Sequence, residues 1–443
     1  MHIVHDRIPA RFQYTIYVTI HTLDIANIFR YIVAICAVAL TVLPSCSKVE
    51  PKDVVFEERE KTVLLYFASH NNLSMDAAAN ISKIIQGYVP SDGNIVLYCN
   101  NFDLSTKQMK DTLPLLVNIS RNKKGDVQID TIYKFPYINS CTKNQMKSVL
   151  NITKTICPAR HYGLVLWSHG TGWLPQGYYK AHAFTSSDEG VMYSHQRSRF
   201  PAPPGGVDPY AHMVKSFGSE LGTEMSIFDV QEAIGETHFD FVAMDACFMG
   251  GVEVAYQIKD CCDYFIGSPA EILTDSYPYN TVIEKMFNGD YTGVSRSIFD
   301  YYNAQSGEYK SVTIATVKCS ELDAVATEAK ALFANYRDNI PSLDVTSVQR
   351  YFRYDDHWFY DLKDFLDILC GASETAALTS ALHNAVIAKY TTGRIINLEI
   401  DPAKFSGLST YIPDAEETTL MTYYPKYAWN DEVQMIVPAT SSE

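Results

Sequence analysis

Two cysteine patterns are missing from this sequence: the Cys-x-x-Cys pair and the mixed Cys/His spacing of a zinc site. The ten cysteines are scattered over 443 residues, which argues against a disulfide framework. No loop has the ligand spacing of a calcium site either. We therefore expect no metal and no cofactor.

Basic residues are fewer than acidic ones. The chain has 36 Lys and Arg against 51 Asp and Glu, a formal net charge of −15. An acidic surface argues against nucleic acid as a partner and is compatible with basic substrates. The hydrophobic fraction of 47% is that of an ordinary globular protein, and the length permits a large core. We expect a monomer.

A long apolar run is also missing, since the run at residues 32–43 is too short to span a bilayer as a helix. A basic residue precedes it and small residues follow, the pattern of a signal peptide. Leu43-Pro-Ser-Cys46 resembles a bacterial lipobox, whose cysteine becomes the lipidated N-terminus. We predict a leader over 1–45 and a lipidated tether over 46–60. They would hold the protein at a bacterial cell envelope, facing the periplasm or the outside. The alternative is a secretory signal that is cleaved nearby and releases the chain.

The body of the chain alternates apolar runs with amphipathic stretches. Residues 62–67 form a continuous apolar run, typical of a strand that is buried on both faces. The next predicted elements are a helix capped by Ser74, a strand 94–99, a hairpin 113–135 and a helix 143–156. This order favours an α/β layered fold.

Elements of the second half are predicted from caps and periodicity. Ser226 is expected to cap the helix that precedes the apolar run 241–244, and Ser320 is expected to cap a second, longer helix. The remaining predictions are a strand 311–316, a helix 378–390, a strand 407–413, a folded domain over 61–418 and a tyrosine-rich tail over 419–443. The aromatic stretch 351–360 is interpreted as an edge of the core.

Cys247 lies where an apolar strand meets a helix. Asp240-Phe-Val-Ala-Met-Asp-Ala-Cys247 is followed by Gly250 and Gly251, which permit a sharp turn. A thiol at a helix N-terminus feels the positive end of the helix dipole, which favours the nucleophilic thiolate. Such a position suits attack on a carbonyl carbon. The alternative is a small buried residue in a strand–helix turn.

His169 ends a second apolar strand, in Gly163-Leu-Val-Leu-Trp-Ser-His169, and glycines follow it. The carboxyl ends of parallel strands meet at one edge of a sheet, where α/β folds place their sites. We expect Cys247 and His169 to form a nucleophile–base pair there. The N–H groups of Gly170 and Cys247 would face a developing oxyanion. The alternative for His169 is a structural histidine.

The two motifs together resemble a known family. Leu166-Trp-Ser-His-Gly-Thr-Gly-Trp173 and Met244-Asp-Ala-Cys-Phe-Met-Gly250 are similar to those of the clostripain-like cysteine peptidases, relatives of caspases, legumain and gingipains. The resemblance covers about residues 61–413. It implies a caspase-like three-layer α/β sandwich with a mostly parallel central sheet flanked by helices. It also implies a cysteine endopeptidase in which Cys247 attacks the peptide carbonyl and His169 protonates the leaving amine.

The resemblance further implies a pocket for a basic side chain on the acyl side of the cut bond. Asp245 lies two residues before Cys247, and Asp275 lies in the loop after the strand 264–267. A carboxylate in a partly dry pocket pairs with a guanidinium through two hydrogen bonds. We predict cleavage after arginine or lysine, with Asp245 and Asp275 as binding residues and Glu271 as a third candidate. The alternatives are a turn or cap residue for Asp245 and an ordinary loop aspartate for Asp275.

Residues 174–223, between the two motifs, have little periodicity and several prolines. A loop this long inside a compact domain is usually functional or disordered. In the family resembled, cleavage in this region matures the enzyme, which implies self-cleavage after a basic residue. Lys215 is the first candidate, followed by Arg197 and Arg199, and then Lys180. The alternative is an insertion with no role in processing.

Two other classes of function stay open at this point. One is a surface lipoprotein that binds peptide or glycan without turnover, and the other is a hydrolase of a different acyl substrate. The presence of both His169 and Cys247 favours the peptidase with a protein or peptide substrate that carries basic residues.

Overall fold

The computed structural model describes residues 56–178 and 224–437. Within these ranges, residues 72, 101, 104–107, 110–112, 137, 236 and 355–357 are not described. The described part belongs to one compact unit, Lys52–Glu443. The predicted lipidation site and the four cleavage candidates lie outside the described residues: Cys46, Lys180, Arg197, Arg199 and Lys215.

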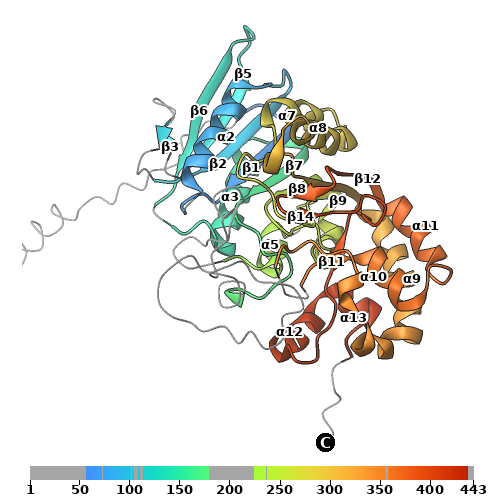
Figure 1. The fold of residues 1–443 in the computed structure, drawn as a ribbon. Helices are drawn as coiled ribbons and strands as arrows, with labels where there is room; N and C mark the ends of the chain where they lie inside the picture. The colour runs from blue at the N-terminus through green and yellow to red at the C-terminus, as the bar shows by residue number, and fades with distance from the viewer. Residues whose placement is uncertain are drawn as a thin grey trace, which may run out of the picture. The chain divides into compact units, whose positions relative to one another are not determined.

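A nine-stranded sheet forms the middle layer, in the order β12-β10-β9-β8-β7-β1-β2-β5-β6 (Figure 1). Its centre is parallel and consists of β1 (Arg59–Phe67), β2 (Gly93–Cys99), β7 (Ala159–Trp167), β8 (Phe239–Asp245) and β9 (Cys262–Gly267). Its margins are antiparallel and consist of β10 (Thr313–Lys318) and β12 (Val386–Thr391) on one side, and β5 (Leu115–Arg121) and β6 (Val127–Lys134) on the other. The predicted α/β fold with a largely parallel sheet is confirmed.

Helices cover both faces of the sheet, and the C-terminal halves of the central strands β1 and β7 are accordingly apolar. One group packs together on one face: α2 (Ser74–Gln86), α7 (Tyr279–Phe287) and α8 (Tyr291–Asn303). A second group packs in a continuous series: α3 (Lys143–Ile156), α5 (Ile227–Ile234), α6 (Val252–Gln257), α13 (Ala428–Val433), α9 (Leu322–Tyr336) and α11 (Ala376–Ala385). In Figure 1, α2, α7 and α8 lie in the upper part of the view, apart from the orange helices α9 and α11.

Of the three predicted helix caps, one is confirmed. The Ser226 hydroxyl accepts a hydrogen bond from the Asp229 N–H, and the Asp229 carboxylate accepts one from the Ser226 N–H, which makes a capping box at the start of α5. The prediction for Ser74 is wrong, because its hydroxyl donates to the carbonyls of Ser69 and Asn71 instead. The prediction for Ser320 is also wrong, because this residue lies within a 3₁₀ turn that precedes α9.

The predicted helix 378–390 is wrong in its second half. Helix α11 ends at Ala385, and the next six residues form β12, which pairs with β10. The segment Val386-Ile-Ala-Lys-Tyr-Thr391 is rich in β-branched and aromatic residues, which favour a strand. The edge strand β10 supplies the backbone hydrogen-bond partners for this segment. The non-local pairing therefore overrides the helical period.

The C-terminal region packs onto the domain. The residues assigned to a tail form α12 (Thr418–Tyr423), a 3₁₀ turn and α13, and Trp429 is fully buried. The predicted strand 407–413 is reduced to β15 (Ser409–Thr410), which pairs with β11 (Tyr360–Asp361) ahead of α10 (Leu362–Cys370). The remaining short strands form two hairpins, β3 (Phe102–Asp103) with β4 (Gln108–Met109) and β13 (Arg394–Ile395) with β14 (Leu398–Glu399).

Candidate active site

The turns that carry His169 and Cys247 start at the same level of the sheet. Strands β7 and β8 are parallel neighbours, with Trp167 paired to Asp245 in register. Each candidate residue follows its strand by two positions, so the two turns leave the sheet side by side. The structure thus brings together the two turns that carry the residues the sequence predicts as a pair.

The backbones of these turns are in contact. A Cβ atom on Gly170 would lie 2.3 Å from the carbonyl oxygen of Cys247 and 2.9 Å from the Ala246 Cβ. Gly172 has φ +59°, and a Cβ there would lie 2.7 Å from the carbonyl oxygen of Phe248. Only glycine permits this approach, since real side chains do not tolerate such distances. The glycines after His169 are therefore what lets the two turns meet.

The sulfur of Cys247 lies under the loop that follows β9. Cys247 is 1% exposed. The Ile272 N–H donates a hydrogen bond to its Sγ at 3.2 Å, and Sγ lies 3.6 Å from the Ile272 carbonyl oxygen. The next residue, Phe248, has φ 61°, a left-handed conformation that is rare for an aromatic residue. Its N–H donates to the Ala270 carbonyl at 3.0 Å, so the same loop holds the strained turn in place.

A second segment braces both the turn and the loop. The ring of Phe248 stacks on Phe359 with 4.5 Å between centroids and contacts the edge of Phe352 at 5.6 Å. Arg353 forms a two-pronged ion pair with Glu271, with Nη2 to Oε1 at 3.0 Å, and the two side chains are 1% and 4% exposed. The described residues of the aromatic stretch, 351–354 and 358–360, are thus buried in the core, and they also contact the nucleophile turn. The sequence reasoning missed Arg353, and only the crowding of aromatic residues around it was a signal.

The carboxylate of Asp245 binds residues 276, 277 and 279, which lie further along the segment that follows β9. Asp245 is fully buried, and its carboxylate accepts hydrogen bonds from the Tyr279 hydroxyl at 2.7 Å, the Tyr277 N–H at 3.4 Å and the Ser276 hydroxyl. The Trp167 indole N–H donates to the same hydroxyl at 2.8 Å. Ser276 has φ 67°, so the backbone bends sharply where it meets the carboxylate. The donors named here, two hydroxyl groups and one backbone N–H, are all uncharged.

The other two candidate acids also have partners within the chain. The side chain of Asp275 is 45% exposed and pairs with Lys83 of α2 at 2.7 Å, and it accepts a hydrogen bond from the Tyr301 hydroxyl. Burial acts to raise the pKa of Asp275, but the hydrogen bonds from Lys83 and Tyr301 and the charge of Lys83 outweigh it, so the pKa is lowered. Glu271 is neutralised by Arg353. Asp245 contacts Ser276 and Asp275 precedes Ser276 in the chain, whereas Glu271 pairs with Arg353 of the aromatic segment.

A small cavity of about 100 Å³ opens beside His169. His169 and Gly170 contribute to its lining, together with residues of α3, α5, the sheet and the turns and loops beside them. Leu166 and Met244 line the cavity, whereas the polar atoms of the next side chains, Trp167 and Asp245, contact Ser276. The cavity therefore lies mainly on the face of the sheet opposite Asp245.

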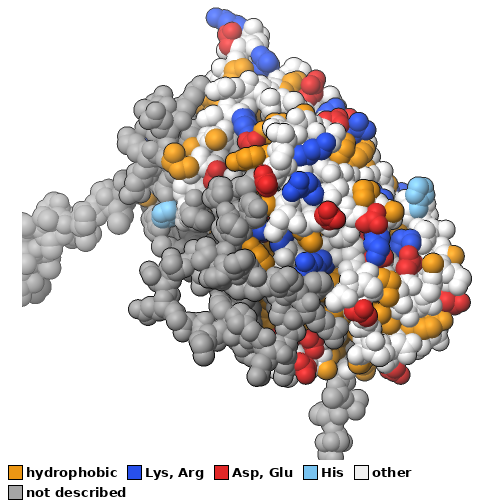
Figure 2. All heavy atoms as spheres, in the orientation of Figure 1, with side chains coloured by type: hydrophobic (Ala, Val, Ile, Leu, Met, Phe, Trp, Pro, Cys, Tyr) orange, Lys and Arg blue, Asp and Glu red, His pale blue; other side chains and the backbone are white. Residues whose placement is uncertain are grey.

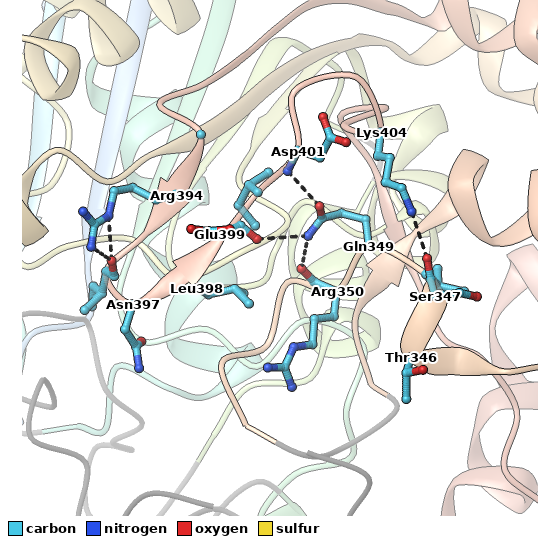
Figure 3. Close-up of a pocket in the computed structure, with 14 residues that line it drawn as sticks. Thr346, Ser347, Gln349, Arg350, Arg394, Asn397, Leu398, Glu399, Asp401 and Lys404 are labelled. Atoms are coloured by element: carbon cyan, nitrogen blue, oxygen red, sulfur yellow. Dashed lines mark hydrogen bonds between the residues drawn. The ribbon is translucent and has the colours of Figure 1, made fainter. Parts of the chain in front are cut away.

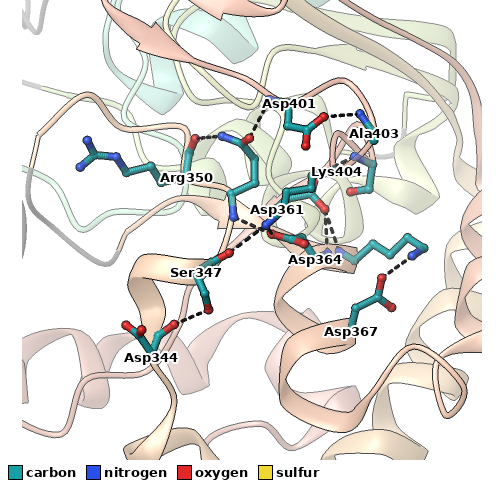
Figure 4. Close-up of polar contacts among 12 residues, drawn as sticks. Asp344, Ser347, Arg350, Asp361, Asp364, Asp367, Asp401, Ala403 and Lys404 are labelled. Carbon is teal, nitrogen blue, oxygen red and sulfur yellow. Dashed lines mark hydrogen bonds and ion pairs between the residues drawn. The ribbon is translucent and has the colours of Figure 1, made fainter.

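A wider hollow of about 740 Å³ lies between residues 346–350 and the stretch 393–404 (Figure 3). Gln349 ties its walls together, since its Nε2 donates to the Arg350 carbonyl at 2.7 Å and its Oε1 accepts from the Asp401 N–H at 2.9 Å. Below it, Asp364 accepts from the Gln349 N–H at 2.6 Å and from Lys404 Nζ at 3.1 Å (Figure 4). Neither His169 nor Cys247 lines this hollow.

Charged groups of both signs are interspersed on the visible face of the domain (Figure 2). Among the described residues, no helix is long and apolar enough to cross a membrane.

The sequence profile of the clostripain family, a family of peptidases, matches residues 65–193 and 215–439. The chain belongs to the clostripain family. Both turns lie within the matched residues, and the unmatched stretch 194–214 lies inside the long loop between them. A comparison with curated proteins found no match.

Solved structures of C11 proteases resemble this clostripain-family enzyme over most of its length. One is an inactive zymogen from Parabacteroides distasonis, with 26% identity, a TM-score of 0.66, and coverage of 86% of this chain and 99% of that one. Another is a secreted C11 cysteine protease from Bacteroides thetaiotaomicron in complex with an irreversible peptide inhibitor, with 26% identity, a TM-score of 0.66, and coverage of 85% and 99%. The enzyme is therefore a cysteine peptidase by family and by fold.

Proposed function

We propose that this enzyme is a secreted endopeptidase that cuts after arginine or lysine, with Cys247 as nucleophile and His169 as acid–base. The observation that carries the proposal is the register of β7 and β8, which places the two turns in backbone contact at the carboxyl edge of the sheet. The two motifs on these turns are those of a cysteine peptidase family.

The proposed reaction uses groups of both turns. The thiolate of Cys247 attacks the peptide carbonyl carbon, and the N–H groups of Gly170 and Cys247 stabilise the oxyanion. His169 gives a proton to the leaving amine and then takes one from the water that hydrolyses the thioester. In the described state Ile272 covers the sulfur, so a bound substrate must replace the contact between the Ile272 backbone and Sγ.

We assign the basic side chain of the substrate to Asp245 and Asp275. Both acids border Ser276, and Asp275 already binds one cation, Lys83, which supports its suitability for an ammonium or guanidinium group. A substrate cation must displace Lys83. The displacement costs little free energy, because an exposed ion pair is weak. Glu271 is assigned a structural role instead, because Arg353 occupies both of its oxygens within a buried pair.

Secretion, anchoring and processing complete the proposal. Cys46 would carry the lipid, consistent with secreted relatives in the family. Self-cleavage is assigned to the loop between the two motifs, and Lys215 is the first candidate because the family match resumes there. The loop ends are held together, since Gln176 Nε2 donates to the Glu224 carbonyl at 2.7 Å and the Gly177 N–H donates to the Glu224 carboxylate at 2.8 Å.

The test compares the full chain as wild type and as Cys247→Ala, by gel and intact mass. Two fragments in the wild type and one chain in the variant would support self-processing, and the masses would name the cut residue. Both proteins are then assayed on peptides that differ only in Arg, Lys, Ala or Asp before the cut bond. Cys370→Ala, at the partly buried cysteine that ends α10, serves as the control and should cut like the wild type. Turnover by a folded Cys247→Ala variant, or equal cutting after Ala and Arg, would refute the proposal.

A further inference from the structure

The cavity beside His169 has a definite place relative to the proposed reaction. Leu166 and Met244 are register partners on β7 and β8, and both line the cavity. The next residues along these strands point to the opposite face, where Asp245 meets Ser276 and Tyr279. The cavity and the proposed pocket for the basic side chain therefore lie on opposite faces of the sheet, at the edge where the turns of His169 and Cys247 leave it.

The walls of the cavity are mostly apolar and adaptable, with Ser168, Thr171 and Glu224 among the polar residues that line it. Four methionines contribute to the walls: Met146 of α3, Met225 ahead of α5, Met244 of β8 and Met249 of the nucleophile turn. Methionine has a flexible, polarisable side chain that adjusts to an irregular apolar partner. Met225 and Met249 are partly exposed, whereas Met146 and Met244 are buried, so the first two form the rim and the last two the floor.

The size of the cavity selects among side chains. A cavity of roughly 150 Å³ holds a benzene ring. The cavity here measures about 100 Å³, which suits a branched aliphatic side chain better than an aromatic one.

From this placement we infer that the cavity binds the side chain of the residue directly after the cut bond, and that it selects leucine, isoleucine, valine or methionine there. The inference rests on the proposed function. Successive side chains of an extended peptide point in opposite directions, so a basic residue directed to the Asp245 face sends its successor to the other face. His169 lines the cavity and protonates the amine of that same successor residue.

The experiment uses the full chain and peptides of the form acetyl-Ala-Ala-Arg-Xaa-Ala-Ala-amide, with Xaa as Gly, Ala, Val, Leu, Phe, Trp or Asp. We expect kcat/KM to be at least about tenfold higher for Leu than for Gly, because a hydrophobic pocket discriminates by that much for each methylene or two. We expect Trp and Asp to fall below Leu. Met225→Trp should fill the cavity and reduce the ratio of Leu to Gly toward one. The matched control Met75→Trp, at a methionine of α2 that is 73% exposed, should keep the wild-type ratio.

Peptide binding to the Cys247→Ala variant is a second measurement, and it requires no turnover. Four peptides are compared by competition: Arg-Leu, Arg-Gly, Ala-Leu and Ala-Gly at the two central positions. Equal binding of the Leu and Gly peptides, together with equal kcat/KM, would overturn the inference. Equal binding of the Arg and Ala peptides would instead count against the proposed basic specificity, so the two failures are distinguishable.

Discussion

The ion pair between Glu271 and Arg353 offers the sharpest test of how the site is built. Arg353→Met removes the guanidinium and leaves the Glu271 carboxylate in a place where it is 4% exposed. Breaking a buried pair by removing one partner costs about 3–5 kcal/mol, because the remaining charge is desolvated without compensation. A domain of ordinary stability has only about 5–15 kcal/mol in total, so the variant should lose a large share of it.

The assay is urea unfolding at pH 7, with the double variant Glu271→Gln/Arg353→Met beside the single one. We expect the double variant to recover part of the loss, because it no longer buries an unpaired charge. The matched control is Lys330→Met, which breaks a pair with Glu432 of similar length, 3.0 Å, but with side chains that are 53% and 45% exposed. That control should cost about 0–1 kcal/mol.

Activity provides the second reading of the same variants. The pair fixes Glu271, and the next residue in the chain covers the Cys247 sulfur with its N–H. We expect Arg353→Met to lower kcat/KM by roughly 100-fold, since a displacement of about 1 Å near the reacting atoms has that effect. Arg353→Lys should restore only part, because an ammonium cannot make the two-pronged contact. If Arg353→Met is no less stable than Lys330→Met and cuts like the wild type, the pair does not brace the site.

Three further predictions follow from other contacts. Lys83→Gln removes the cation that occupies Asp275, so KM for arginine and lysine peptides should fall by up to about fivefold, since exposed pairs are worth up to about 1 kcal/mol, and an unchanged KM would contradict this. Burial raises the pKa of Glu253, against hydrogen bonds from tyrosine and threonine hydroxyls that lower it. Its contribution to stability should therefore be complete below about pH 4 and decline as pH rises through the folded pKa, so urea unfolding from pH 4.5 to 8 should show a steeper decline in the wild type than in Glu253→Gln. Gly170→Ala would place a Cβ 2.3 Å from the carbonyl oxygen of Cys247, and kcat/KM should drop by about 100-fold. The control Gly289→Ala has open space around its Cβ but is strained at φ +73°, so it should lose some stability and keep kcat/KM; circular dichroism checks the fold of both.

Much of the site was predictable because its determinants are local. An apolar run followed by a reactive residue and glycines predicts a strand that ends in a sharp turn, and β7 and β8 with their turns confirm it. The capping box of Ser226 is likewise contained in four residues. Parallel order then places the ends of these strands at one edge, so the sequence alone predicted that His169 and Cys247 would lie together.

The partners of the charged residues depended on tertiary structure. Glu271 meets Arg353 across 82 positions, and Asp275 meets Lys83 across 192, so no local pattern could show which cation reaches which carboxylate. The strand β12 has the same origin, because the pairing with β10 that stabilises it is non-local. The sequence by itself determined the fold class, the family and the pair of turns at the sheet edge, since these follow from short runs of residue types. Only the folded chain decided what covers the nucleophile and what neutralises each acid, since those contacts join segments that are distant in sequence.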